Sequence, residues 1–211
     1  MKLYYHACRY LLRTAVPVLT RIEVQGLEHV PRTGPAILVS NHISTVDPPI
    51  LFAYVKRQIR FIAKIEVFDN LFYRIALPPL ENTIPIHRGK ADRGALRKAE
   101  AVLKAGGVIG IYPEGTRSQS GETQEAHTGV VFLARRTGAP IVPVALSGTE
   151  AIFQSHFPWY RRARVSMTFG EPFSLAELGD ARHGDREALA HAVMARVATL
   201  LPPRYRGIYA V

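Results

Sequence analysis

The chain of 211 residues is 47% hydrophobic, which is enough to bury one substantial core, and its single cysteine, Cys8, excludes an intrachain disulfide. Its 16 glycines and 15 prolines fit an α/β fold with many loops and exclude a low-complexity disordered chain. The 27 Lys and Arg residues outnumber the 17 Asp and Glu residues, and the net charge of +10 attracts the chain to anionic surfaces such as lipid.

Residues 1–22 are predicted to form a helix that lies on a membrane surface, followed by a single domain over residues 23–211. Helix signals extend from Tyr4 to Leu19. A helix that spans a bilayer needs about 20 predominantly apolar residues, but the segment Met1–Leu19 is interrupted by Lys2, His6, Arg9 and Arg13. We therefore expect an interfacial helix, and the run also lacks the uninterrupted apolar core of a signal peptide.

Helices and apolar strands alternate along the rest of the chain. Helices are predicted at Pro48–Val55, Ala91–Lys104, Thr128–Arg136 and Asp185–Leu200. Strands are predicted at Ala36–Val39, Ile59–Ala63, Thr83–His87, Val108–Tyr112, Ile141–Leu146 and Ala163–Phe169. This pattern predicts an α/β fold with a mixed, mostly parallel sheet covered by helices, in which functional side chains lie at the ends of strands.

The segment Asn41–Asp47 places an imidazole and a carboxylate directly after the first of these strands. His42 and Asp47 are five residues apart, which is the minimum set for a general base and a group that orients it. Pro48 favours a turn before a helix start, so the two side chains can meet. The alternative is structural: Asp47 is a suitable N-cap for the helix, and a lone histidine near a strand end is often only a packing residue.

The segment Tyr112–Ser118 forms a glycine-containing polar loop at the end of the strand predicted at Val108–Tyr112. Backbone N–H groups in such a loop and the guanidinium of Arg117 suit an anion such as phosphate. The alternative is an ordinary turn in which Glu114 and Arg117 pair in solvent. Two further cations follow strand-like runs, Lys64 and Arg88.

In this order the motifs resemble those of the glycerolipid acyltransferase family, over about Gly26 to Leu146. The resemblance depends on the blocks N-H-x4-D at 41–47, F-I-A-K-x-E at 61–66, I-P-I-x-R at 84–88 and Y-P-E-G-T-R-S at 112–118. The best-known members of the family acylate 1-acylglycerol 3-phosphate to phosphatidate. The resemblance therefore implies a glycerol-3-phosphate acyltransferase-like fold and a role in phospholipid biosynthesis.

The resemblance also implies a mechanism. His42 would take the proton of a glycerol hydroxyl as that oxygen attacks an acyl thioester, which is acyl-CoA or acyl carrier protein. Asp47 would hold the imidazole in the required tautomer. Neither a metal nor a cofactor is implied.

The implied acceptor site uses the second loop. Arg117, with the backbone of Gly115 and Thr116, would bind the phosphate of lysophosphatidate or a similar lysolipid. Lys64 and Arg88 would add positive charge. Glu114 is expected to be ionised, because it lies beside an arginine, and to orient these cations or bind a glycerol hydroxyl.

One position departs from the family pattern, since His127 stands where many members have lysine. We interpret His127 as a residue at a helix start without a catalytic role, and this position leaves the identity of the acceptor open. A thioester hydrolase and a nucleic-acid-binding protein are the alternatives, but the chain carries no recognised nucleic-acid motif.

We expect the protein at the cytoplasmic face of the cell membrane, bound to anionic lipid without spanning the bilayer. Besides the first helix, an aromatic and basic cluster is suited to a headgroup region. Its alternative is a loop whose aromatic residues close the core while its arginines stay in solvent. The cluster consists of Phe153, Phe157, Trp159, Tyr160, Arg161, Arg162 and Arg164.

Overall fold

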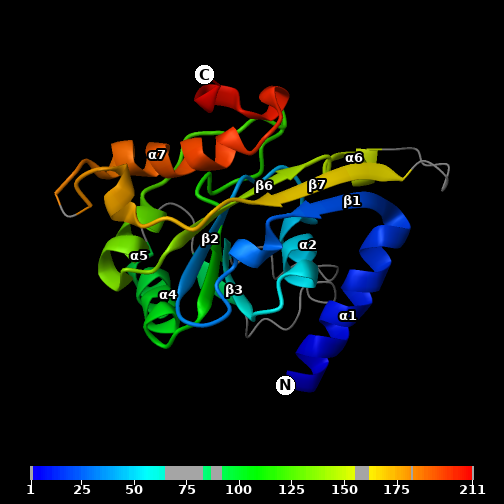
Figure 1. The fold of residues 1–211 in the computed structure, drawn as a ribbon, viewed down its shortest axis with the longest axis horizontal. Coiled ribbons are helices and arrows are strands. Elements are labelled where there is room, and N and C mark those ends of the chain that lie inside the picture. Colours follow the sequence, from blue (N-terminus) through cyan, green and yellow to red (C-terminus); the bar gives the residue numbers. More distant parts are fainter. Residues whose placement is uncertain (1, 65–82, 87–91, 155–161, 182, 211) are drawn as a thin grey trace.

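The computed structural model describes residues 2–64, 83–86, 92–154, 162–181 and 183–210. Within these residues one seven-stranded sheet has the order β1-β7-β6-β2-β5-β3-β4 (Figure 1). The strands are β1 Thr20–Gln25, β2 Ala36–Ser40, β3 Ile59–Lys64, β4 Thr83–Ile86, β5 Val108–Ile111, β6 Ile141–Ser147 and β7 Ala163–Phe169. The helices are α1 Lys2–Leu19, α2 Asp47–Tyr54, α4 Arg93–Lys104, α5 Gly129–Thr137, α6 Ala151–Gln154 and α7 Arg186–Thr199.

The central strands are parallel, and their register brings three strand ends together. β2 pairs in parallel with β5 on one side and with β6 on the other. β7 is antiparallel to β6, and β1 is parallel to β7. The carboxyl ends of β2, β5 and β6 therefore lie at one edge of the sheet, which is where open α/β sheets place their sites.

Helices cover both faces of the sheet because successive side chains of each buried strand point to opposite faces. Ile37 and Val39 of β2 pack into the cluster that contains the apolar sides of α4, α5 and α7. Ala36 and Leu38, from the same strand, pack into the second cluster with α1 and α2. β2 is buried throughout, as expected for a strand covered on both faces.

The predicted fold class is confirmed: the sheet is mixed and mostly parallel, and helices cover it. Each predicted helix and strand is present, with shifted ends. Two of the predicted ends lie outside the described residues: His87 of the strand predicted at Thr83–His87 and Ala91 of the helix predicted at Ala91–Lys104. Among the described residues, one strand and one α-helix were not predicted: β1 and the short α6. β1 has the sequence TRIEVQ and alternates between buried or half-buried and exposed residues, so its charged side hides it from a search for apolar runs.

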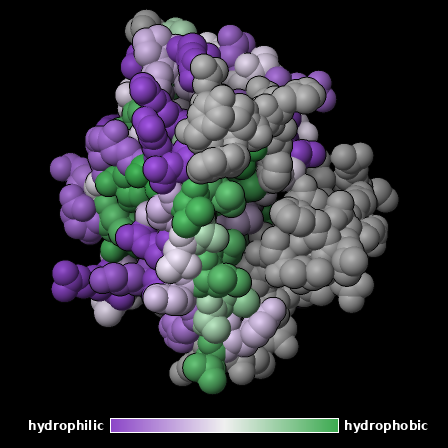
Figure 2. Space-filling model, turned by 90° about the vertical axis from the view of Figure 1, so that its right-hand side faces the viewer, coloured by the Kyte–Doolittle hydropathy of each residue, from purple (hydrophilic) through white to green (hydrophobic). Residues whose placement is uncertain are grey.

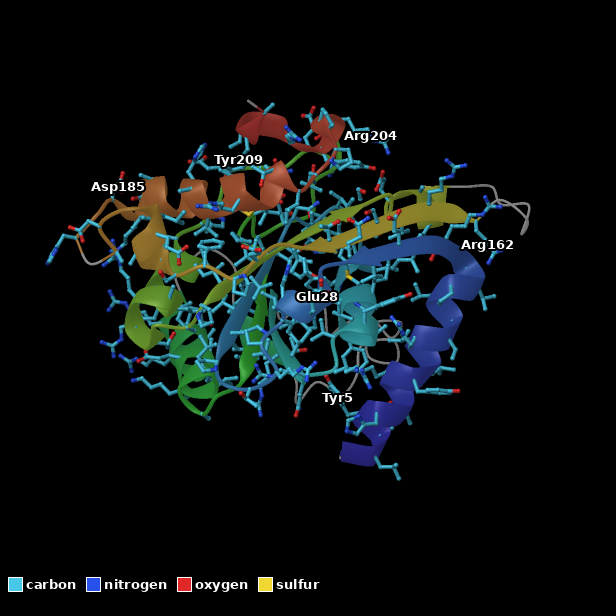
Figure 3. The ribbon with its side chains drawn as sticks, in the orientation of Figure 1. Tyr5, Glu28, Arg162, Asp185, Arg204 and Tyr209 are labelled. Atoms are coloured by element: carbon cyan, nitrogen blue, oxygen red, sulfur yellow. The ribbon has the colours of Figure 1, made fainter. Side chains whose placement is uncertain are left out.

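α1 lies along the side of the molecule and buries only part of its surface. Tyr5 contacts Phe52 of α2 edge to face, with ring centroids 4.7 Å apart, and Figure 3 labels it on this helix. The guanidinium of Arg13 lies 3.9 Å from the centroid of the Tyr54 ring. β1, which follows α1 directly, pairs with β7, so residue 22, the predicted end of the first segment, lies inside a strand of the sheet.

Candidate active site

His42 and Asp47 face each other in the loop between β2 and α2. His42 Nδ1 lies 2.8 Å from Asp47 Oδ2, and the histidine side chain is 18% exposed while the carboxylate is fully buried. An ionised carboxylate accepts hydrogen bonds only, so Nδ1 carries the proton in this pair when the imidazole is neutral. Nε2 of His42 then has a free lone pair, and the side chain that carries it is only partly buried.

The alternative interpretation of Asp47, as the N-cap of α2, is wrong. Val46 occupies that position, and Asp47 is the first helical residue. Its Oδ2 also accepts hydrogen bonds from the backbone N–H groups of Ile43 and Ser44, each at 2.8 Å, so the carboxylate organises the loop before the helix. The buried charge is thus satisfied by the loop that presents His42.

The segment that follows β5 also contacts His42. The backbone N–H of Ser118 donates to the carbonyl of His42 at 2.8 Å. The ring of Tyr112 stacks on the imidazole, with centroids 4.3 Å apart and planes inclined by 28°. The backbone N–H of His42 donates to Glu114 Oε1 at 3.3 Å. The two segments that the sequence singled out, which are about 70 residues apart, therefore form one site.

The expectation that Glu114 is ionised beside an arginine is wrong. Its side chain is buried, and burial raises the pKa of Glu114 to about 8, with a smaller increase from the charge of Asp47. Hydrogen bonds from the backbones of His42 and Gln124 act in the opposite direction and are outweighed. The side chain of Arg117 is exposed and makes no ion pair with Glu114. Glu114 Oε2 is buried without a hydrogen-bond partner among the described residues.

The structure describes only some of the remaining predicted site residues. Gly115 adopts φ +66°, a backbone conformation that favours glycine, and a Cβ there would lie 2.8 Å from Cδ2 of His127. Thr116 and Arg117 follow it in the chain, and both residues are exposed. The side chain of Lys64 and the whole of Arg88 lie outside the described residues, so their predicted roles stay predictions.

His127 is the residue that departs from the family pattern. It precedes Thr128, the N-cap of α5, and its backbone N–H donates to the carbonyl of Pro113 at 2.9 Å. Its exposed ring lies against Gly115. The position therefore borders the loop of the predicted phosphate site. No group of three or more His, Cys, Asp or Glu side chains that would suit a metal ion occurs within the described part of the chain.

A family model described as acyltransferase matches residues 21–147, which include both segments of the site. The chain belongs to the acyltransferase family. The resemblance inferred from the motifs is confirmed.

The chain is also similar to individual acyltransferases. Over 135 residues the chain is 32% identical to the 1-acyl-sn-glycerol-3-phosphate acyltransferase of Borreliella burgdorferi, covering 63% of this chain and 54% of that protein. The corresponding protein of Bacillus subtilis is 25% identical over 93% of this chain and 96% of its own length. The crystal structure of the 1-acyl-sn-glycerophosphate acyltransferase PlsC of Thermotoga maritima superposes with a TM-score of 0.67, at 26% identity, over 93% of this chain and 79% of that one.

The matches differ in how much of each relative they include. The aligned part of the chain spans about half of the Borreliella protein and 37% of a chloroplastic 1-acyl-sn-glycerol-3-phosphate acyltransferase of Arabidopsis thaliana, to which it is 32% identical over 63% of its own length.

Glu114 gives this acyltransferase a testable pH dependence. Its folded pKa of about 8 lies above its ordinary value of 4.5, so the folded protein binds a proton there that the unfolded chain releases above that value. This contribution to stability is fully present at acidic pH and is lost as the pH rises through the folded pKa. Glu114→Gln, which stays neutral, should gain stability relative to wild type by roughly 4 kcal/mol between pH 5 and pH 8.

The measurement is urea unfolding of both proteins at several pH values, and the exposed Glu122→Gln provides a matched control. A difference in unfolding free energy between wild type and Glu114→Gln that did not change with pH would show that Glu114 is ionised in the folded protein.

Three residues of the site were not predicted. Asn41 lies in the H-x4-D block, but its amide bonds both the N–H and the carbonyl of Leu146 in β6, at 2.8 Å each. Tyr112 stacks on the imidazole, and Thr149 bonds Asp47. For Thr149 the sequence carried no signal, since it lies 102 residues from Asp47. The strand order supplied the missing information, because β6 is the neighbour of β2.

Proposed function

We propose that the protein transfers an acyl group from an acyl thioester to the free hydroxyl of 1-acylglycerol 3-phosphate and so forms phosphatidate for phospholipid biosynthesis. The thioester is acyl-CoA or the acylated form of acyl carrier protein. The observation that carries the proposal is the 2.8 Å hydrogen bond between His42 and a buried Asp47 at the end of a parallel strand. The relatives from Borreliella burgdorferi and Bacillus subtilis are both named 1-acyl-sn-glycerol-3-phosphate acyltransferase, which supports the choice of acceptor.

In the proposed reaction His42 Nε2 removes the proton of the acceptor hydroxyl as its oxygen attacks the thioester carbonyl. The new C–O ester bond forms, the C–S bond breaks, and the imidazolium returns the proton to the leaving thiolate. Asp47 stabilises the imidazolium through Nδ1–H and remains ionised itself. Transfer is direct, so neither a serine nor a cysteine nucleophile takes part.

The second loop supplies the proposed acceptor site. Arg117 of this loop is exposed, and its planar guanidinium suits two phosphate oxygens at once. Gly115 gives the loop a positive φ, and turns of this kind can form backbone N–H sites for anions. In this proposal Glu114, held neutral by burial, shares a hydrogen bond with the glycerol hydroxyl.

The test is an acceptor panel with labelled acyl-CoA and acyl carrier protein, read by mass spectrometry of the lipid product. We expect phosphatidate from lysophosphatidate, and Arg117→Ala should raise KM for this acceptor about tenfold or more while KM for the donor stays within about twofold. Arg117→Lys should rescue only partly, because lysine lacks the fork.

Arg97→Ala, at an exposed position of α4, is the matched control and should leave both KM values unchanged. Equal effects of Arg117→Ala on donor and acceptor would argue against a phosphate site at this loop. Release of free fatty acid without an acylated lipid would identify a thioester hydrolase instead.

We further propose that α1 binds the cytoplasmic face of the cell membrane. Large apolar side chains on its outer side are exposed to solvent, and Figure 2 shows apolar residues gathered along this helix. They are Leu3, Tyr4, Tyr10, Leu11, Val18 and Leu19. No helix among the described residues is both long and apolar enough to cross a membrane. Burial of this side in the headgroup region is the arrangement of an interfacial helix.

The neighbouring aromatic and basic cluster is only partly described. Arg162, labelled in Figure 3, donates to the carbonyl of Pro17 at 3.0 Å, so this arginine lies at the carboxyl end of α1. Residues 155–161, with most of the aromatic side chains, lie outside the described part of the chain. The membrane role of the cluster stays a prediction.

Vesicle co-sedimentation tests the role of α1. Binding should strengthen with anionic lipid and weaken with salt, because the net charge is +10 and salt screens its attraction to the surface. Leu3→Ser combined with Leu11→Ser should lower the bound fraction, since both side chains are exposed on α1. Ile208→Ser, at an exposed apolar residue outside α1, is the control. Wild-type protein that stayed in the supernatant with anionic vesicles at low salt would contradict the proposal.

A further inference from the structure

The carboxylate of Asp47 has one oxygen that the H-x4-D segment does not use. Oδ2 accepts from His42, Ile43 and Ser44, all within that segment. Oδ1 instead accepts from the hydroxyl of Thr149, at 2.6 Å. Both Asp47 and Thr149 are fully buried. A hydrogen bond from a hydroxyl to a buried carboxylate is charge-assisted, and its short length agrees with that.

We propose that Thr149 is a positioning residue for acyl transfer: its hydroxyl fixes the plane of the Asp47 carboxylate and thereby the ring of His42. The inference rests on the proposed function of His42 and Asp47. The three donors at Oδ2 hold one oxygen, but a carboxylate held at one oxygen can still turn about that point. The bond at Oδ1 removes this freedom. Because Nδ1 of His42 bonds the same carboxylate, the direction of its Nε2 depends on it.

Thr149 is itself held in place by the backbone. It follows β6 after Gly148, which has φ +80°, and a Cβ at Gly148 would collide with the carbonyl of Arg164 in β7. A β-branched side chain on a fixed backbone has few rotamers, so the hydroxyl has a defined direction. Thr149 therefore transmits the geometry of the β6 end to Asp47.

The C-terminal segment braces the same loop. The hydroxyl of Tyr205 accepts from the backbone N–H of Gly148 at 3.1 Å and donates to Glu150 Oε1 at 2.6 Å. The same segment also bonds the loop that precedes α5: the N–H of Thr123 donates to the carbonyl of Tyr205 at 2.9 Å. Figure 3 shows this segment, marked by Arg204 and Tyr209, beside α7. Gly148 and Glu150, the two residues that flank Thr149 in the chain, thus bond a residue that lies outside all four motif blocks.

The test compares Thr149→Val, which keeps the shape and loses the hydroxyl, with Thr149→Ser, which keeps the hydroxyl. Thr149→Val should lower kcat about 10- to 100-fold with both KM values within about threefold, because the base is misdirected while substrate binding is intact. Thr149→Ser should stay within about threefold of wild type. Thr137→Val, which removes a hydroxyl bonded to a backbone carbonyl in α5, is the control and should be unchanged.

The pH profile separates positioning from packing. The Thr149 hydroxyl stabilises the ionised carboxylate, so its loss favours protonation of the His42–Asp47 pair. The acidic limb of kcat/KM should therefore move to higher pH in Thr149→Val and not in Thr149→Ser. A defect of packing alone would lower the thermal midpoint without moving this limb.

The outcomes are distinct from those for the proposed function. Wild-type kcat and pH profile in Thr149→Val, with an inactive His42→Ala variant, would overturn the role of Thr149 and leave the function standing. If the valine variant does not fold, Thr149→Ala and Thr149→Ser replace the comparison. Equal activities of these two would overturn the proposal, and an active serine variant beside an impaired alanine variant would support it.

Discussion

Replacing His42 by alanine is expected to lower kcat for acyl transfer by roughly 10²- to 10⁴-fold, the usual contribution of a positioned general base. The fold should persist, because the imidazole is partly exposed and its removal leaves Asp47 with hydrogen bonds from Ile43, Ser44 and Thr149. The measurement is kcat with labelled acyl-CoA and lysophosphatidate, together with the thermal midpoint of unfolding.

A second histidine provides the control for this substitution. His183 is a surface residue that pairs with Asp180 at 3.5 Å, and His183→Ala should keep wild-type activity. His42→Ala with kcat within about threefold of wild type would remove His42 from the mechanism. Loss of activity together with a large fall in the thermal midpoint would instead assign His42 a structural role.

The sequence predicted where the site lies because its two segments follow buried strands. Ala36–Val39 and Val108–Tyr112 are short apolar runs, and parallel strands with covered faces are recognised by that pattern. β2 and β5 are neighbours in parallel register, with Val39 opposite Ile111. Residues that follow the two strands must therefore meet. This is why His42 and Glu114 come together without any contact having been visible in the sequence.

The protonation state of Glu114 was beyond the sequence. Arg117, a neighbour in the chain, argued for an ionised carboxylate, but the arginine is exposed whereas the glutamate is buried. Desolvation then outweighs the hydrogen bonds that favour the charged form. Burial depends on the tertiary packing around the loop, including the bond from Gln124, and local sequence does not determine it.

The position of Thr149 was also unpredictable, for a topological reason. The sequence identified Ile141–Leu146 as a strand, but not its place in the sheet. Only the order β6-β2-β5 puts the residues after β6 beside Asp47. Edge strand β1 shows a related limit, since Arg21 and Glu23 on its exposed side mask a strand that is specified by pairing with β7.

Asp47→Asn is expected to lower kcat by about 10²-fold or more while disturbing the structure little. The asparagine carbonyl oxygen can accept from Ile43 and Ser44, and its NH₂ group can donate to the Thr149 hydroxyl, which can reverse its role. What the variant lacks is the negative charge that stabilises the imidazolium. Activity should fall although the backbone of the loop is preserved.

Asp47→Ala separates charge from structure at the same position. It leaves the N–H groups of Ile43 and Ser44 and the hydroxyl of Thr149 without their buried acceptor, and each such loss costs about 1–3 kcal/mol. We expect the alanine variant to be less stable than the asparagine variant by roughly 2 kcal/mol or more in urea unfolding, with activity at least as low. Equal stability of the two variants would show that the carboxylate does not organise the loop. An asparagine variant with wild-type kcat would show that its charge takes no part in the reaction.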